Sequence, residues 1–173
     1  IVSDRFQKTN RDPNKQTPMS EFAIYPWDQK DEFKDLRMFA FEITKAHLYP
    51  FVPRAHDVDQ DKHKVLSAIA KIISENASVH NAAYKLLRTS DWDFMAVYYD
   101  MIDHFCHSFM KYHPPKLAGV DQNNYDIFKE AVTGSYIYQD MMLERKMKLI
   151  DEDTTVIIMS DHGFESGNKR ILN

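Results

Sequence analysis

The sequence predicts an α/β fold in which two parallel strands flank a long helix, with a separate helical segment before them. The first observation is a short apolar run at residues 156–160, which acidic turn residues precede and Gly163 follows. Such a run is typical of a strand buried on both faces of a parallel sheet. The second is an aromatic-rich apolar run at residues 93–99, and the third is a helix-like apolar stripe between the two runs. Strand, helix and strand predict a parallel, right-handed βαβ unit.

Three segments follow from the pattern along the chain. Residues 1–27 are rich in Asn, Asp, Pro, Thr and Ser without sustained periodicity, which indicates a loop or extended segment. Residues 28–90 carry apolar positions spaced by three and four, which predicts a helical insertion that acts as a cap or flank. Residues 91–173 are predicted to form part of the α/β catalytic core.

Finer boundaries are expected inside these segments. Asp28 is a plausible N-cap for a helix that ends before Pro50, and a break near residues 75–76 predicts two further helices. Asn123 or Asn124 is expected to cap the long helix that leads to the second strand.

Composition restricts the class of protein. The 173 residues are 43% hydrophobic and 28% charged, which is normal for a soluble globular domain. A net charge of −4 gives no reason to expect a nucleic-acid partner, and no apolar run approaches the ~20 residues that cross a bilayer. The single cysteine, Cys106, excludes an internal disulfide and favours a reducing, cytoplasmic location. A first residue other than Met and a short C-terminal stretch after Gly163 predict a fragment, whose partner is the remainder of its parent polypeptide.

Two pairs of polar residues follow the two predicted strands. Asp103 and His107 are four residues apart, so a helix places both side chains on one face. Asp161 and His162 end the second strand. Because parallel strands share an edge at their carboxyl ends, the pairs are expected to converge there. Mixed N and O ligands suit zinc, manganese or iron, although each pair alone also occurs by chance or as a turn cap.

These motifs resemble a known family. Asp-x-x-x-His after one strand, a long helix, and then Asp-Thr-Thr-Val-Ile-Ile-Met-Ser-Asp-His-Gly-Phe resemble the alkaline phosphatase superfamily. The similar branch is the type I phosphodiesterase/nucleotide pyrophosphatase group, with its phosphohydrolase/phosphomutase relatives. The resemblance covers residues 93–167 and implies part of a three-layer α/β sandwich with parallel strands, plus a helical insertion.

The resemblance also implies a site and an activity. Asp103 and His107 match ligands of one divalent metal, and Asp161 and His162 match ligands of another; zinc is favoured and manganese is possible. The implied substrate is a small-molecule phosphate ester, a phosphodiester or nucleotide pyrophosphate, hydrolysed in two metal-assisted steps. The family's Thr or Ser nucleophile lies upstream of the matched residues, so no catalytic residue is expected in this segment, which alone is expected to be inactive. A metal-dependent phosphomutase and a non-catalytic metal-binding or interaction module are the alternatives.

Overall fold

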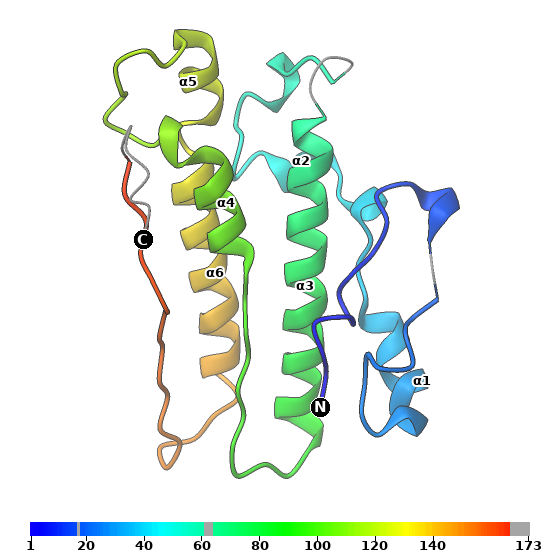
Figure 1. The fold of residues 1–173 in the computed structure, drawn as a ribbon. Helices are drawn as coiled ribbons and strands as arrows, with labels where there is room; N and C mark the ends of the chain where they lie inside the picture. Colours follow the sequence, from blue (N-terminus) through cyan, green and yellow to red (C-terminus); the bar gives the residue numbers. More distant parts are fainter. Residues whose placement is uncertain (17, 61–63, 167–173) are drawn as a thin grey trace. The chain divides into compact units, whose positions relative to one another are not determined.

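The computed structural model describes residues 1–16, 18–60 and 64–166, and helices are its main regular elements (Figure 1). The chain divides into two compact units: residues 1–48 with 59–101, and residues 49–58 with 102–173. The end of the predicted core segment, residues 167–173, lies outside the described residues. In order, the elements are η1 (Pro13–Lys15), η2 (Trp27–Gln29), α1 (Lys30–Phe33), η3 (Lys34–Leu36), η4 (Ala40–Glu42), α2 (Lys45–Leu48), η5 (Ala55–Asp57), α3 (Val65–Thr89), α4 (Met101–Phe109), η6 (Met110–Tyr112), α5 (Gln122–Phe128) and α6 (Ala131–Met147), where η marks a 3-10 helix.

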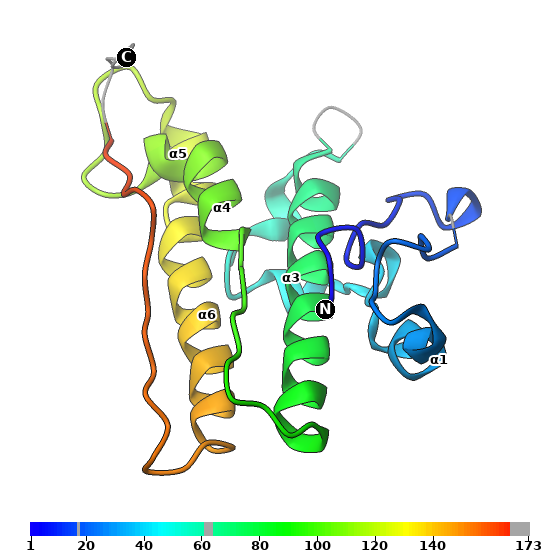
Figure 2. The ribbon, with the colours of Figure 1, turned by 60° about the horizontal axis from the view of Figure 1, so that its bottom comes forward.

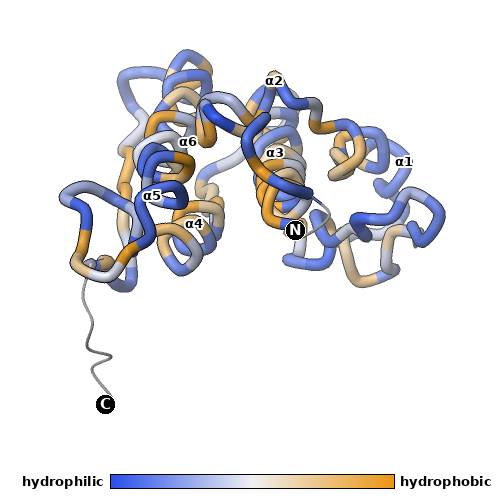
Figure 3. Tube along the Cα trace, turned by 90° about the horizontal axis from the view of Figure 1, so that it is seen from above, coloured by the Kyte–Doolittle hydropathy of each residue, from blue (hydrophilic) through white to orange (hydrophobic). Residues whose placement is uncertain are grey.

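The long helix α3 organises the first unit. It contains neither Gly nor Pro, and hydrophobic residues recur along it (Figure 3). The predicted break near residues 75–76 is wrong. The Lys71 ammonium lies 3.0 Å from the Glu75 carboxylate, one turn further on, and Asn76 is buried beside Ala77. An i,i+4 ion pair and a continuous buried face both favour an uninterrupted helix.

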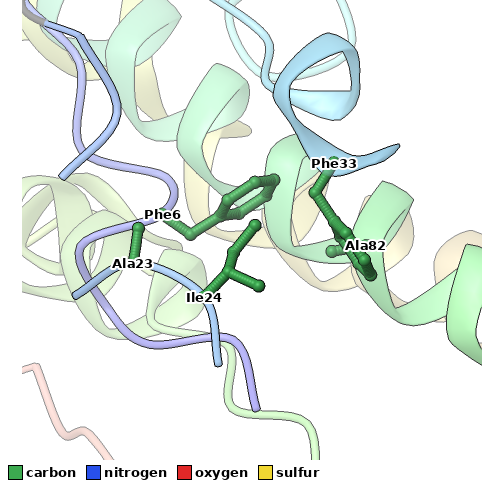
Figure 4. Close-up of a cluster of buried hydrophobic side chains, with 5 residues drawn as sticks. All are labelled: Phe6, Ala23, Ile24, Phe33 and Ala82. Atoms are coloured by element: carbon green, nitrogen blue, oxygen red, sulfur yellow. The ribbon is translucent and has the colours of Figure 1, made fainter. Parts of the chain in front are cut away.

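The N-terminal segment packs against α3 through a small apolar cluster. Residues Val2 and Ile24 form an isolated antiparallel bridge, which brings the two ends of this segment together. Phe6 is fully buried, and its ring lies 6.4 Å from that of Phe33 in a perpendicular arrangement. Figure 4 shows the cluster, whose buried members are Phe6, Ala23, Ile24, Phe33 and Ala82.

The helix expected from Asp28 towards Pro50 is replaced by short pieces. The segment consists of η2, α1, η3, η4 and α2, none longer than four residues. Two side chains of α3 hold this irregular backbone. Ser78 Oγ accepts a 2.8 Å hydrogen bond from the Met38 N–H, and Asn81 Nδ2 donates to the Leu36 carbonyl at 3.1 Å. Backbone groups that a continuous helix would pair internally are satisfied here by side chains of α3.

In the second unit, residues 49–58 pack against α4 and α6. The buried Phe51 ring lies 5.1 Å from Phe105 of α4 and 5.5 Å from Tyr138 of α6. At Gly134, α6 approaches the backbone of this loop so closely that a Cβ would lie 3.0 Å from the Phe51 Cα atom and would overlap the Pro50 carbonyl oxygen. The absence of a side chain at Gly134 therefore permits this packing.

The single long helix expected before the second strand is also divided. Helices α5 and α6 are separated by Lys129 and Glu130. The N-cap of α5 is Asp121, two or three positions before the expected Asn123 or Asn124. The Asp121 carboxylate accepts a 2.8 Å hydrogen bond from the Asn124 N–H, which is the usual role of an N-cap acid.

The predicted α/β sandwich with parallel strands is wrong for this structure. Across residues 1–16, 18–60 and 64–166 no strand forms, and residues 92–100 and 151–166 follow non-helical paths (Figures 1 and 2). The apolar side chains expected in a buried sheet are exposed: Phe94 by 84%, Ile157 by 77% and Met159 by 86%. An extended run becomes a β-strand only when a neighbouring strand pairs with its backbone, and these two runs have no such neighbour among the described residues.

Among the described residues, no helix combines the length and the hydropathy required to span a bilayer.

Candidate functional site

Helix α4 places the first polar pair on one face, as the four-residue spacing predicts. The His107 Nε2 atom lies 3.4 Å from the Asp103 Oδ1 atom. Phe105, Cys106 and Phe109 are buried on the other side of the helix, which turns Asp103 and His107 towards the surface of the unit.

The extended segment after α6 brings the second pair to the same place. The His162 Nε2 atom lies 3.6 Å from the Asp103 Oδ1 atom and 3.9 Å from the Asp161 Oδ1 atom. Since both carboxylate oxygens lie within 3.9 Å of one imidazole nitrogen, Asp103 and Asp161 are less than roughly 8 Å apart at these atoms. The structure therefore assembles all four sequence-predicted residues within the second unit, although no sheet edge carries them.

Asp103 occupies the centre of this arrangement. Its side chain is 35% exposed, and its Oδ1 atom lies near both imidazoles. The side chain of Asp161 is 88% exposed and lies 3.9 Å from His162. The resemblance grouped Asp103 with His107 and Asp161 with His162. The structure adds a link between the pairs, because His162 is nearer to Asp103 than to its sequence neighbour Asp161.

A second contact orients the His162 ring. Its Nδ1 atom lies 3.1 Å from the Gly163 carbonyl oxygen, which can only accept a hydrogen bond. A proton on Nδ1 leaves the lone pair of the neutral imidazole on Nε2, the atom that faces the two carboxylates. This is the tautomer of a histidine that binds a metal through Nε2.

The donor set can be compared with the needs of a divalent ion. Carboxylate oxygens and imidazole nitrogens suit zinc and manganese. Two ligands of a tetrahedral zinc with ordinary bond lengths lie about 3.3 Å apart, close to the 3.4 and 3.6 Å between Asp103 and the two imidazoles. Within the described ranges, however, no group of three or more His, Cys, Asp or Glu side chains converges on one metal position. Spacing suited to zinc ligands is therefore present only in pairs, Asp103 with His107 and Asp103 with His162.

Cys106 is excluded from this site by its position. The side chain is buried in the apolar face of α4, and burial, with a smaller contribution from the Asp103 carboxylate, raises the pKa of the thiol. A protonated, buried thiol is a packing group rather than a nucleophile or ligand.

Two residues at the site escaped the sequence analysis. The Phe164 ring lies 5.0 Å from the His107 ring and 5.1 Å from the His162 ring, and Ser166 Oγ donates a 3.0 Å hydrogen bond to the Met110 carbonyl. The signal for Phe164 was its spacing: in an extended segment, residues 162 and 164 lie on the same side. Nothing in the sequence indicated the hydrogen bond of Ser166.

Carboxylate and imidazole groups are ligands of zinc, and enzymes that hydrolyse phosphate esters often use bound metal ions. Comparison of the sequence with family profiles agrees with this class: the profile described as type I phosphodiesterase/nucleotide pyrophosphatase matches residues 10–173, and the chain belongs to that family. The family supports phosphodiesterase/pyrophosphatase-type hydrolysis as its general activity, consistent with the alkaline phosphatase superfamily. No curated protein and no solved structure matches the chain.

Proposed function

We propose that this chain supplies metal ligands to a metal-dependent hydrolase of phosphate esters, of the phosphodiester or nucleotide pyrophosphate type, and holds only part of the active site. The observation that carries the proposal is that one oxygen of the Asp103 carboxylate lies 3.4 Å from the His107 Nε2 atom and 3.6 Å from the His162 Nε2 atom. Asp103 and His107 would hold one divalent ion, zinc or manganese, and Asp161 and His162 the other. Bound metal would lower the pKa of a hydroxyl nucleophile and stabilise the leaving oxygen.

The protein's own contribution is to bring donors of the right kind together. Neighbouring carboxylates repel one another when both are ionised, and a cation between them relieves that repulsion. Helix α4 fixes Asp103 and His107 on a regular backbone, and the Gly163 carbonyl orients His162. None of these four side chains acts as a nucleophile in the proposal, so the chain binds and positions but does not form a covalent intermediate.

Metal binding is tested by titrating the purified chain with Zn²⁺ or Mn²⁺ and measuring the heat of binding. We expect His107→Gln and His162→Gln each to weaken binding by more than about 10-fold, since even outer-sphere partners of metal sites are worth 10- to 100-fold. His104→Gln is the matched control, because His104 is an exposed histidine of the same helix. Equal affinity for all of these variants would refute the assignment of the ligands.

The incomplete site is tested with an aryl phosphodiester and added zinc or manganese. We expect no turnover by the chain, because the proposed site lacks a positioned nucleophile and loss of positioning costs orders of magnitude in rate. Metal-dependent turnover that His162→Gln abolishes would show instead that the chain contains a complete catalytic site.

A further inference from the structure

Phe164 is the only side chain of the described residues whose ring contacts both imidazoles of the proposed metal site. Its ring is nearly perpendicular to that of His107, at 88°, and steeply inclined to that of His162, at 67°. Both centroid distances, 5.0 and 5.1 Å, fall within the range of favourable edge-to-face aromatic pairs. The three rings thus form a contiguous aromatic group beside Asp103.

The backbone that carries Phe164 is attached to the other end of α4. Two residues beyond Phe164, Ser166 Oγ donates a 3.0 Å hydrogen bond to the Met110 carbonyl, which immediately follows α4. Residues 162, 164 and 166 alternate along an extended segment, so their side chains lie on one side of it. That side faces α4, with His162 near Asp103, Phe164 against His107 and Ser166 at Met110.

The imidazoles themselves are weakly restrained. The side chain of His107 is 68% exposed and that of His162 is 51% exposed, so neither is fixed by burial in the core. A half-buried aromatic ring in contact with both limits the rotamers that either imidazole can adopt. Ligands held in position before the metal arrives bind it more tightly, because less conformational entropy is lost.

We propose that Phe164 is a positioning residue that holds the imidazoles of His107 and His162 beside the Asp103 carboxylate. The expected effect on metal affinity rests on the proposed function. The positioning of the imidazoles does not require a metal. Phe164 touches no reacting group, and it acts through the two histidines. A side chain that lacks a ring at this position releases both imidazoles.

The test compares Phe164→Ala, Phe164→Leu and Phe164→Tyr in the full chain. Without metal, NMR records the imidazole C–H resonances, assigned with His107→Gln and His162→Gln; the ring current of Phe164 shifts these resonances only while the rings remain in contact. With Zn²⁺ or Mn²⁺, calorimetry gives the affinity. Phe94→Ala is the matched control, because Phe94 is 84% exposed and belongs to the first unit, whereas both histidines belong to the second. Far-UV circular dichroism checks that every variant is folded.

We expect the Ala and Leu variants to move both imidazole resonances and to weaken metal binding by about 10-fold, the effect of losing an outer-sphere partner. Phe164→Tyr retains a ring, so its metal affinity should stay within about 2-fold of that of the wild type. Unchanged imidazole resonances in folded Phe164→Ala would overturn the inference, whether or not metal binds. If the resonances move in Phe164→Ala but the wild-type chain binds neither Zn²⁺ nor Mn²⁺, the positioning is supported and the proposed metal-dependent function is rejected.

Discussion

Replacing Gly134 by alanine tests the closest approach in the second unit. In a solvent-exposed helix this substitution would stabilise by about 1 kcal/mol, because alanine has the higher helix propensity. In α6, the new Cβ would lie 3.0 Å from the Phe51 Cα atom and 3.1 Å from the Pro50 carbonyl carbon, and it would overlap the Pro50 oxygen. All three are backbone atoms, which cannot rotate away. The helix and the loop must therefore separate by roughly 1 Å to reach ordinary contact distances.

That separation loosens the aromatic packing around Phe51, whose ring contacts Phe105 and Tyr138. Overpacking a core costs about 1–3 kcal/mol, and the gain in helix propensity offsets part of it. We expect Gly134→Ala to destabilise the chain by ~1–2 kcal/mol and to lower Tm by about 2–8 °C. Thermal unfolding followed by circular dichroism measures the change. Gly163→Ala is the control, because a Cβ there meets no atom within 4 Å. A Gly134→Ala variant as stable as the wild type, or more stable, would refute the close approach.

Further predictions concern the buried serine of α3 and a lysine of α6. Ser78→Ala removes the acceptor of the Met38 N–H and should lower the free energy of unfolding by about 1–3 kcal/mol. Thr89→Ala is the control and should cost less, because it removes an exposed hydroxyl that is bonded within α3. Equal losses of unfolding free energy in chemical denaturation would contradict this reasoning. Burial lowers the pKa of Lys146 to about 8, so between pH 8 and the usual lysine pKa the unfolded state binds more protons and stability rises with pH. Lys146→Met should remove that part of the rise in Tm between pH 7.5 and 9.5, and an identical pH profile in the variant would contradict the shift. Tyr138, whose pKa burial raises, acts in the opposite direction, but only near and above pH 10.

The sequence determined the local placement of Asp103 and His107 on one face of a helix. The four-residue spacing of Asp103 and His107 requires one helix face, and apolar residues at 105, 106 and 109 require the opposite face to be buried. The motif from Asp153 to Phe164 also indicated the family, which the profile match over residues 10–173 shows. Both patterns are local, because each involves only residues that lie close together in the sequence.

A local sequence pattern could not determine whether a sheet forms. The run at 156–160 has the β-branched and apolar residues of a strand, and its backbone is non-helical, but Ile157 and Met159 are exposed. A strand depends on hydrogen bonds to another segment, and no local pattern says whether that segment is present. The sequence pattern thus predicted where the chain leaves helical structure, and the prediction of a sheet was wrong for the described residues.

The continuity of α3 and the arrangement at Asp103 were likewise decided by tertiary contacts. A break was predicted near Glu75 and Asn76, and Asn has a low helix propensity, yet the Lys71–Glu75 ion pair and the buried face of α3 favour a continuous helix. The approach of His162 and Phe164 to α4 joins residues more than fifty positions apart. Such contacts depend on the path of the whole intervening chain, including the close packing at Gly134, so the sequence named the four candidate ligands and the folded unit determined that they meet around one carboxylate.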